Sequence, residues 1–254
     1  MIKSSFLKTL CEAKAKGEKK IALLIDPDKA GRPILDEAKS LLVSDLVDFL
    51  FVGGSLISEG DLDETVKSLK SFSDHPLVIF PGAAFHVSEY ADSILFLSLV
   101  SGRNPEFLIG QQLLAAPKVK ASGLEVCPTA YMLIDGGRPT SVSYISNTLP
   151  IPNDKPDIAA VTAMTAEMMG MKLVFMDAGS GAMHAISPEM VKAVRAKVGC
   201  PIIVGGGLRK IEDIKTIFEA GADLVVVGSL FEDDPSRSLE VFSAIKDKAD
   251  IEIF

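Results

Sequence analysis

The stretch from Pro201 to Ser229 constrains the fold of this chain most strongly. It contains two short apolar runs, 202–204 and 224–227, separated by an amphipathic segment with helical spacing. Each run is followed by glycine, which lets the backbone approach a ligand and leaves N–H groups for an anion. A lone glycine run is more often a tight turn, but Gly228-Ser229 stands at the spacing of the next βα unit. Two such strand ends near a C-terminus are typical of the phosphate site of a (β/α)8 barrel.

The rest of the chain repeats this alternation of apolar runs and helical segments. Its 254 residues are a typical length for one α/β barrel domain, so we predict a single domain spanning 1–254. Buried parallel strands are expected at Ile21–Ile25, Phe49–Val52, Leu77–Phe80, Ser93–Leu97, Leu124–Tyr131, Leu173–Asp177, Ile202–Val204 and Leu224–Val227. Eight such runs with helices between them favour an α/β fold, a closed (β/α)8 TIM barrel, over an open sheet.

Three segments give more local expectations. The segment 81–92 is too short for a regular helical connection, so we expect the third helix of the barrel to be missing or replaced by a loop or strand. Asp135-Gly136-Gly137 is typical of a hairpin turn, which predicts a returning strand at 142–145 that forms a flap above one end of the barrel. Residues 5–15 predict an amphipathic helix that covers the barrel bottom.

Other residues are interpreted as structural. The methionines of the helical segment 158–170 are expected to fill gaps in the core: Met164, Met168 and Met169. The three cysteines show no metal-ligand or CxxC spacing and are expected to be buried thiols: Cys11, Cys127 and Cys200. Ser236 follows an acidic turn and is expected to cap the last helix.

Charge and hydropathy exclude several classes of function. The net charge of −8 argues against a nucleic-acid surface. The apolar runs are too short to span a bilayer, and the N-terminal sequence lacks the apolar region of a signal peptide. We therefore expect a cytoplasmic protein with no integral membrane segment. An acidic protein that binds phosphate must do so locally, through backbone N–H groups, single basic side chains or a metal ion.

The predicted strand ends carry the polar groups of a two-part site. In such barrels the reactive side chains lie at the C-terminal ends of the strands. Residues 178–181, Gly206-Gly207 and Gly228-Ser229 follow three consecutive strands and could wrap one phosphate. Asp26 and Ser55 follow the first two strands, and a carboxylate with a hydroxyl suits Mg²⁺, which uses one or two protein carboxylates. Two anion sites predict two phosphorylated substrates.

Several motifs together resemble one enzyme family. They are LIDPDK at 24–29, FVGGS at 51–55, FPG at 80–82, FLSLVSGRNPEFLIGQ at 96–111, PTAYMLIDGG at 128–137, SYISNTLPIP at 143–152, DAGSGA at 177–182, and VGGG and VVVGS near the end. On these residues the chain resembles the geranylgeranylglyceryl phosphate synthase family, which includes the heptaprenylglyceryl phosphate synthases. SGRNP and SYISNT look like the second of the two groups of that family.

The resemblance implies a prenyltransferase. It would transfer a geranylgeranyl or other polyprenyl group from its diphosphate to the C3 hydroxyl of sn-glycerol 1-phosphate, giving an ether lipid precursor and pyrophosphate. Asp26 and Ser55 would hold Mg²⁺ at the diphosphate, and Asp177 would contact the glycerol and assist loss of the C3 proton. The implied glycerol 1-phosphate residues are Phe175, Met176, Asp177, Ala178, Gly179, Ser180, Gly181, Gly206, Gly207, Gly228 and Ser229. A homo-oligomer, a dimer or a larger ring, is also expected.

The chain departs from the family pattern at two positions of the common YxEAGSG motif. Phe175 lacks a phenolic hydroxyl, and Asp177 is one methylene shorter than glutamate. The family's first group has a lysine where Leu24 stands, and Lys29 could supply that charge or be a solvated side chain. Asp28 could be only a helix-capping residue.

Two other functions remain open on the sequence. A sugar-phosphate isomerase or aldolase would need an acid and a base on opposing strands, where this chain offers Asp26 against Cys127 and Thr129. A barrel that only senses a phosphorylated metabolite would bind without turnover. A prenyl chain needs an apolar groove, which Ala83 and Ala84 could provide beside the missing helix. His86 is the one histidine that could face such a site.

Overall fold

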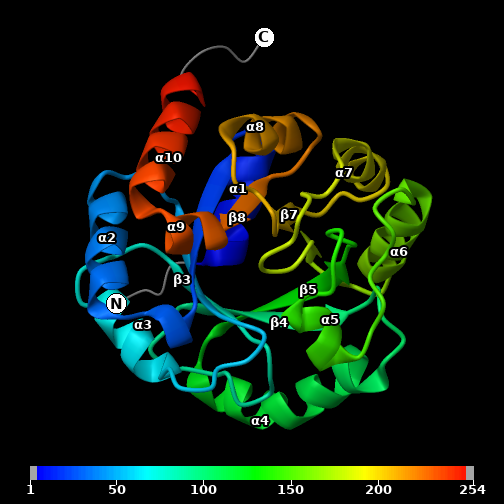
Figure 1. Ribbon diagram of the computed structural model, residues 1–254. Helices are drawn as coiled ribbons and strands as arrows, with labels where there is room; N and C mark the ends of the chain where they lie inside the picture. The colour runs from blue at the N-terminus through cyan, green and yellow to red at the C-terminus, as the bar shows by residue number, and fades with distance from the viewer. Residues whose placement is uncertain (1–4, 250–254) are drawn as a thin grey trace.

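The computed structural model describes residues 5–249, which form a closed barrel of eight parallel strands surrounded by helices (Figure 1). Strands that follow one another in sequence are paired in the barrel, and β8 closes it against β1. The strands are β1 Lys20–Ile25, β2 Phe49–Gly53, β3 Leu77–Phe80, β4 Ser93–Leu99, β5 Glu125–Leu133, β6 Leu173–Asp177, β7 Ile202–Gly205 and β8 Leu224–Val227. The predicted (β/α)8 barrel is confirmed, and 1–4 and 250–254 lie outside the described residues.

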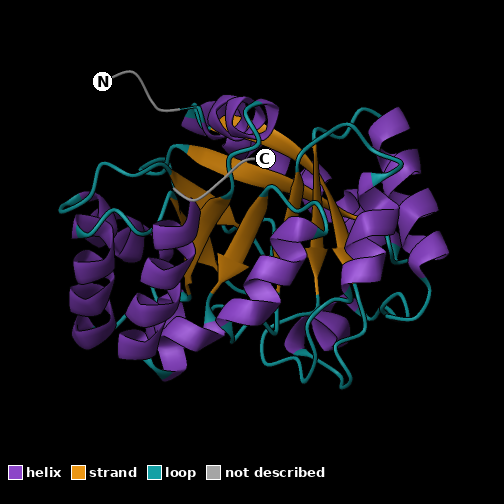
Figure 2. Ribbon diagram, turned by 90° about the horizontal axis from the view of Figure 1, so that it is seen from above, coloured by secondary structure: helices purple, strands orange, loops and turns teal. Residues whose placement is uncertain are grey.

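Helices cover the outside of the strands, as Figure 2 shows from a second direction. They are α1 Phe6–Ala15, α2 Arg32–Val43, α3 Leu62–Lys70, α4 Gln111–Ser122, α5 Ser141–Ser146, α6 Pro156–Met168, α7 Pro188–Arg195, α8 Ile211–Glu219, α9 Ser229–Asp233 and α10 Pro235–Ala249, with short helical turns η1 Pro27–Lys29 and η2 Glu106–Gly110. Turns replace a helix between β3 and β4, so the prediction of a missing third helix is confirmed. None of the described helices is long and apolar enough to cross a membrane.

Aromatic side chains fill the barrel along its interior. Phe6 enters from α1 at the bottom, and its ring packs edge-on against Phe49 at a centroid distance of 4.9 Å. This contact confirms that the N-terminal helix covers the barrel bottom. Nearer the top, the ring of Phe80 stacks on that of Phe175, also at 4.9 Å, and meets the ring of Tyr131 edge-on. The upper rings form the floor of a cavity at the C-terminal ends of the strands.

Carboxylates fasten the opposite, N-terminal ends of the strands. The residue just before β2, β4 and β8 is an aspartate. Its side chain accepts a hydrogen bond from the backbone N–H of the first or second residue of the preceding strand. The pairs are Asp48 with the Ile21 N–H, Asp92 with the Leu77 N–H, and Asp223 with the Ile202 N–H. These bonds contribute to the stability of the barrel rather than to its chemistry, because the reactive groups of such barrels lie at the other end.

The predicted hairpin after β5 is wrong. Residues 141–146 form α5, and Thr140 starts it, because the Thr140 N–H donates to the hydroxyl of Ser143 as in a capping box. Ile134 pairs instead with Ile151, in parallel. The segment still covers the barrel opening, since Val142 and Ile145 of α5 line the cavity. The turn glycines were compatible with either structure, and the capping pair decides for a helix.

Three smaller expectations also need correction. Met168 and Met169 do not fill the core, because their exposed fractions are 78% and 72%. Cys11 is exposed rather than buried, whereas Cys127 is fully buried as expected. Ser236 lies inside α10, and the carboxylate of Asp234 instead accepts the hydrogen bond from the Arg237 N–H at 3.0 Å. In each case the helix itself was predicted correctly, whereas the side on which the residue lies or the residue that caps the helix was predicted incorrectly.

The buried aspartate before β8 gives a test of the fastening at the barrel bottom. Asp223 is 5% exposed and pairs with Arg195 at 2.9 Å. We expect Asp223→Ala to lower the free energy of unfolding by about 3 kcal/mol, since it leaves the Arg195 guanidinium without its carboxylate and the Ile202 N–H without its acceptor.

The control is Asp36→Ala, which removes an exposed aspartate–arginine pair whose side chains are 72% and 93% exposed. Exposed pairs contribute about 1 kcal/mol or less, so this variant should unfold almost as the wild type does. Urea unfolding followed by circular dichroism measures both. Equal losses in the two variants would contradict the assigned role of Asp223.

Candidate active site

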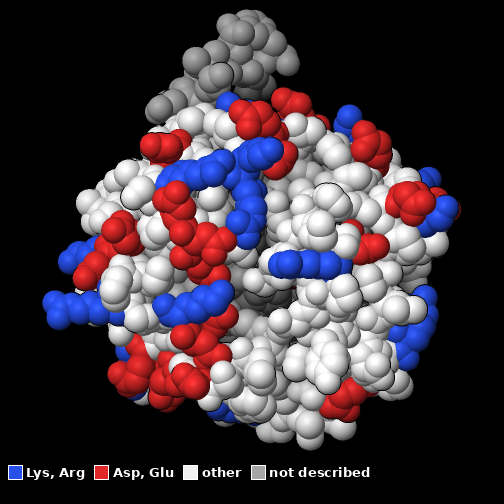
Figure 3. All heavy atoms as spheres, viewed as in Figure 1, with Lys and Arg blue, Asp and Glu red and all other residues white. Residues whose placement is uncertain are grey.

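A cavity of about 390 Å³ opens at the C-terminal end of the barrel, and all eight strands contribute to its lining. Figure 3 shows the hollow near the centre of this face, with acidic and basic side chains beside it. Its mouth is polar, its floor is aromatic, and one arm extends between apolar side chains. This combination can hold a ligand with a charged end and an apolar end.

Glycine-rich loops after β6, β7 and β8 converge at one side of the mouth. The hydroxyls of Ser180 and Ser229 lie 3.4 Å apart and join the loops after β6 and β8. Gly206 has a φ of +77°, and a Cβ there would lie 2.7 Å from the Gly179 nitrogen, so only glycine fits. The backbone N–H groups of Ser180, Gly181, Gly206 and Gly207 donate to no other group in the described part of the chain. Such clustered free N–H groups suit a phosphate.

The strand alternation divides the expected glycerol 1-phosphate residues into two sets. The cavity is lined by Phe175, Asp177, Ser180, Gly181, Gly206, Gly207, Gly228 and Ser229. Met176 and Ala178 do not line it; both are buried in the core outside the barrel interior. Gly179 also lies off the cavity, and its N–H donates to Asp177 at 2.8 Å. For Met176 the division follows from the pleat, because every second side chain of β6 points toward the helices.

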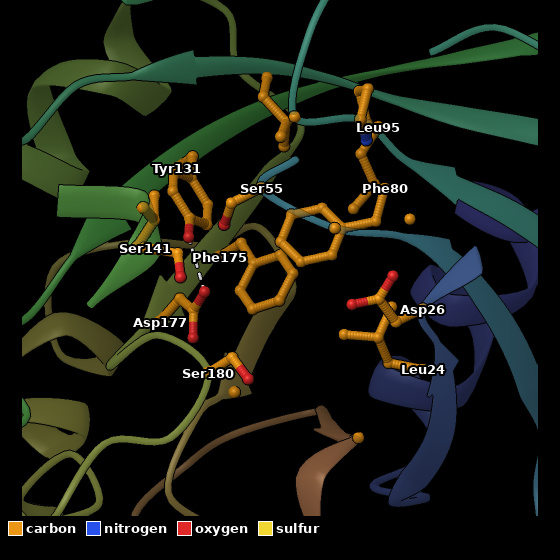
Figure 4. A pocket seen from close by; sticks show the side chains of 18 of the residues that line it. Leu24, Asp26, Ser55, Phe80, Leu95, Tyr131, Ser141, Phe175, Asp177 and Ser180 are labelled. Atoms are coloured by element: carbon orange, nitrogen blue, oxygen red, sulfur yellow. Dashed lines mark hydrogen bonds between the residues drawn. The ribbon is translucent and has the colours of Figure 1, made fainter. Parts of the chain in front are cut away.

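The carboxylate of Asp177 is held on both oxygens. Oδ2 accepts a hydrogen bond of 2.6 Å from the hydroxyl of Tyr131, and Oδ1 accepts the bond from the Gly179 N–H (Figure 4). Burial raises the pKa of Asp177, and both hydrogen bonds act in the opposite direction. The group therefore combines a basic tendency with a fixed orientation at the cavity floor, which suits a general base.

Tyr131 is a site residue that the sequence did not single out. The strand ends indicated Thr129, but its hydroxyl bonds back to the Cys127 carbonyl within the barrel. β5 continues to Leu133, which pairs in register with Asp177, and Tyr131 is the inward residue that pairs with Phe175, two residues before Asp177. Counting in steps of two from Cys127 along a longer strand would have found it.

Asp26 and Ser55 line the other side of the mouth. The Asp26 carboxylate lies against the backbone of Gly54, since a Cβ on Gly54 would be 3.4 Å from Oδ1. Burial raises the pKa of Asp26, the nearby Glu232 carboxylate adds to this effect, and the bond from the Asp28 N–H opposes it. A carboxylate in this position is stabilised by any cation that enters.

Asp28 has a structural role instead. Its carboxylate accepts hydrogen bonds from the Ser58 hydroxyl and from three successive N–H groups of residues 58–60, which holds its pKa well below the usual range. These bonds tie the loop after β2 to the end of β1 and so position Ser55 relative to Asp26. Lys29 also lines the cavity, and its ammonium pairs with Glu232 at 2.6 Å. It is therefore a paired cation at the site rather than a free solvated side chain.

The oxygen donors at this side fit Mg²⁺ by chemistry. Asp26 offers a carboxylate and Ser55 a hydroxyl, which are the hard ligands this ion takes. The described residues contain no cluster of three or more His, Cys, Asp or Glu side chains that could bind a metal ion. Mg²⁺ usually keeps several waters and phosphate oxygens, so one carboxylate is compatible with a site that a substrate completes.

An apolar arm of the cavity runs beside the segment 81–92 toward α4. Ala83 and Ala84 line it from that segment, and further lining comes from Val87, Ile94, Leu95, Phe96, Phe107 and Ala115. A helix between β3 and β4 would add a layer of side chains here, and its absence leaves the arm open. His86 lines the same part of the cavity, as expected for the one histidine near the site. Its Nδ1 accepts the Gly82 N–H, and burial lowers its pKa.

Comparison with known proteins connects this geometry to a family. Residues 14–246 match the model of the PcrB family. A protein of Chitinophaga pinensis named geranylgeranylglyceryl phosphate synthase is 53% identical, with 92% of this chain and 93% of that protein covered. A protein of the same name from Spirosoma linguale is 44% identical, with 94% and 96% covered.

A solved structure of a protein with the same enzyme name is also similar to this chain. The crystal structure of (S)-3-O-geranylgeranylglyceryl phosphate synthase from Thermoplasma acidophilum, in complex with its substrate sn-glycerol-1-phosphate, superposes with a TM-score of 0.87. The two chains are 31% identical over 97% of this chain and 98% of the other. The family match spans nearly the whole barrel, and the expected resemblance is confirmed. The chain therefore belongs to the PcrB family.

Proposed function

We propose that this chain is a geranylgeranylglyceryl phosphate synthase, which transfers a polyprenyl group from its diphosphate to the C3 hydroxyl of sn-glycerol 1-phosphate. The observation that carries the proposal is the division of one cavity into a glycine cradle, an acidic side and an apolar arm. The cradle suits the phosphate of the acceptor. The apolar arm suits the prenyl chain of the donor, and the acidic side suits its diphosphate through a cation. The relatives named above support the same assignment.

The acceptor would lie between the cradle and Asp177. The free N–H groups of residues 180–181 and 206–207 would bind its phosphate, and the neighbouring Asp177 carboxylate would face its hydroxyls. Asp177 would take the proton of the C3 hydroxyl as the C3 oxygen attacks the prenyl group, because it is the buried carboxylate nearest this cradle. Phe175 contributes only the apolar surface of its ring.

The donor diphosphate would bind at Asp26 and Ser55, together with Mg²⁺. When bound there, the ion would stabilise the negative charge that develops on the departing pyrophosphate. Asp26 and Ser55 would orient the donor, and Lys29 would add positive charge beside it. The prenyl chain would then extend into the arm lined by Ala83 and Ala84, with water excluded from its apolar surface.

The competing assignment is a sugar-phosphate isomerase or aldolase. Such an enzyme has no use for an apolar arm that leaves the polar mouth and runs toward α4. The β5 residues considered for that role, Cys127 and Thr129, are buried within the barrel and do not line the cavity opposite Asp26. We therefore favour the transferase. The cytoplasmic location predicted from the sequence stays a prediction.

The direct test uses purified protein, Mg²⁺, labelled glycerol 1-phosphate and a series of prenyl diphosphates of increasing length. We expect one ether-linked lipid product per pyrophosphate released, with the fastest turnover near the geranylgeranyl length. Thin-layer chromatography of the dephosphorylated product measures it. Glycerol 1-phosphate binding without product from any donor would instead support a phosphometabolite sensor and contradict the transferase.

A single substitution separates the two sides of the mouth. We expect Asp26→Asn to lower turnover by about 10²-fold or more, because a carboxamide binds Mg²⁺ poorly. The Asn side chain can still accept the Asp28 N–H, so the local turn is retained. Affinity for glycerol 1-phosphate, measured by calorimetry, should stay within about twofold because that ligand binds the cradle.

Two measurements check the interpretation of this variant. Mn²⁺ binding in the presence of pyrophosphate, followed by electron paramagnetic resonance, should be lost in Asp26→Asn and kept in the exposed control Asp36→Asn. Parallel loss of glycerol 1-phosphate binding in Asp26→Asn would contradict two separate sites.

We also propose that the chain forms a homo-oligomer. Large apolar side chains are exposed on α4, α5 and α6, which follow one another around one side of the barrel (Figure 1). They include Leu113 at 72%, Tyr144 at 86% and Met168 at 78% exposed. Exposed apolar side chains that gather on neighbouring elements are typical of a protein–protein interface. The two exposed methionines that do not fill the core would then pack between subunits.

Light scattering of the purified chain tests this proposal. We expect the mass of a dimer or larger ring, and we expect Leu113→Asp to shift it toward the monomer, because the new charge would be buried at the interface. Ser40→Asp on the exposed side of α2 is the control and should leave the mass unchanged. A wild-type monomer at micromolar concentration would contradict the proposal.

A further inference from the structure

The carboxylate that would take the proton is confined by its surroundings. Asp177 is 8% exposed, and Gly206 packs so close that an added Cβ would lie 2.7 Å from Oδ1. With the Gly179 N–H on Oδ1 and the Tyr131 hydroxyl on Oδ2, the group is fixed in one orientation. The lone pairs that remain are the only ones available to a substrate in the cavity.

Tyr131 differs from the other contacts because, within residues 5–249, it is the only side chain that bonds to the carboxylate. It reaches Asp177 from the neighbouring strand, β5, and it also lines the cavity. Figure 4 shows the two side chains pointing toward each other beside the ring of Phe175. The floor ring closest in sequence to Asp177 is Phe175, which carries no hydroxyl and packs edge-on against Tyr131 at 5.6 Å. A phenol therefore reaches this carboxylate from β5 and not from β6.

A purely structural role has to be weighed against a functional one. Buried tyrosine hydroxyls usually find a partner, and the nearest acceptor can simply be a carboxylate. Here, however, the bond is short and ends on an ionisable group at the cavity, where it stabilises the charged form over the protonated form. Any change in this bond alters the basicity of Asp177 as well as the packing.

We propose that Tyr131 is the positioning residue for proton abstraction: its hydroxyl orients the Asp177 carboxylate toward the acceptor hydroxyl and keeps it ionised. This inference rests on the proposed function. In the step it serves, the C3 oxygen bonds to C1 of the prenyl group as the bond from C1 to the diphosphate oxygen breaks. The electron pair of that bond leaves with pyrophosphate, and the proton of the C3 hydroxyl passes to the Asp177 carboxylate. Tyr131 keeps its own proton throughout.

Among the residues that the structure describes, no second side chain bonds to Asp177, and the bond from the Gly179 N–H is a backbone bond that a substitution at Tyr131 does not remove. Burial and the Asp177 carboxylate both raise the pKa of Tyr131, so the phenol stays a donor. Other ionisable groups near the mouth, Asp26, Lys29, Arg138, His184, Arg209 and Glu232, do not contribute to the pKa of Asp177. The facing residues of β7, Gly205 to Gly207, carry no charge. The effect of Tyr131 on Asp177 can thus be measured by itself.

The test is the pH dependence of kcat in Tyr131→Phe, with both substrates and Mg²⁺ saturating. We expect kcat at neutral pH to fall about tenfold and the acidic limb to move to higher pH by about one unit, because the lost bond raises the pKa of the base. The KM for glycerol 1-phosphate should change less than about threefold, since the cradle is untouched. An unchanged acidic limb would overturn the proposal, whatever happens to the melting temperature.

Fluorotyrosine provides a second measurement that needs no loss of packing. The chain has three tyrosines, so Tyr90→Phe with Tyr144→Phe leaves Tyr131 as the only one. This double variant is the control and should keep the wild-type limb, because both removed rings are exposed. Replacing its remaining tyrosine by fluorotyrosine makes the phenol a stronger donor, which should move the acidic limb to lower pH.

The outcomes separate this inference from the function on which it rests. Absence of product in the wild-type protein would defeat the proposed function. Normal product formation with the same acidic limb in wild type, Tyr131→Phe and the fluorotyrosine protein would defeat only the role of Tyr131. Opposite shifts in the two altered proteins would support it, since a structural role alone predicts no such pair of shifts.

Discussion

Closure of the barrel is the constraint on which the rest of this structure depends. Because β8 pairs with β1, all the strand ends meet at one mouth, and side chains far apart in sequence share a single cavity. The interior must then be filled, and the rings from Phe6 at the bottom to Phe175 near the top do this. The aspartates before β2, β4 and β8 secure the lower end, so the upper end is free to carry chemistry.

The mouth is asymmetric because consecutive strands end in different residue types. Strands β6 to β8 end in glycine loops that expose N–H groups, whereas β1 and β2 lead into the oxygen-bearing side chains of Asp26 and Ser55. The missing helix between β3 and β4 opens a third region, which is apolar. In the proposed reaction this one cavity would hold two anions and a hydrocarbon chain, and the reacting atoms would meet beside Asp177.

Much of this arrangement was predictable from the chain. The apolar runs gave the barrel, and the short segment 81–92 gave its missing helix, because strand period and connection length are local properties. The sequence also indicated Asp26, Ser55 and the glycine loops. The sequence did not show which side of an element faces the core or the site. Met168 and Met169, at the end of α6, are exposed, and Met176 packs in the core outside the barrel interior. Nor did it show that 142–145 is helical rather than a returning strand.

By itself, then, the sequence determined which segments are strands, where their polar ends lie and to which family the chain is similar. Only the tertiary structure decided which groups touch. Tyr131 meets Asp177, which lies 46 positions away on the neighbouring strand, and Asp28 is bonded to the loop of residues 58–60 instead of lining the cavity. The reason is physical: spacing along a chain fixes the period of an element, whereas the partner of a side chain depends on the register between elements and on the twist that closes the barrel.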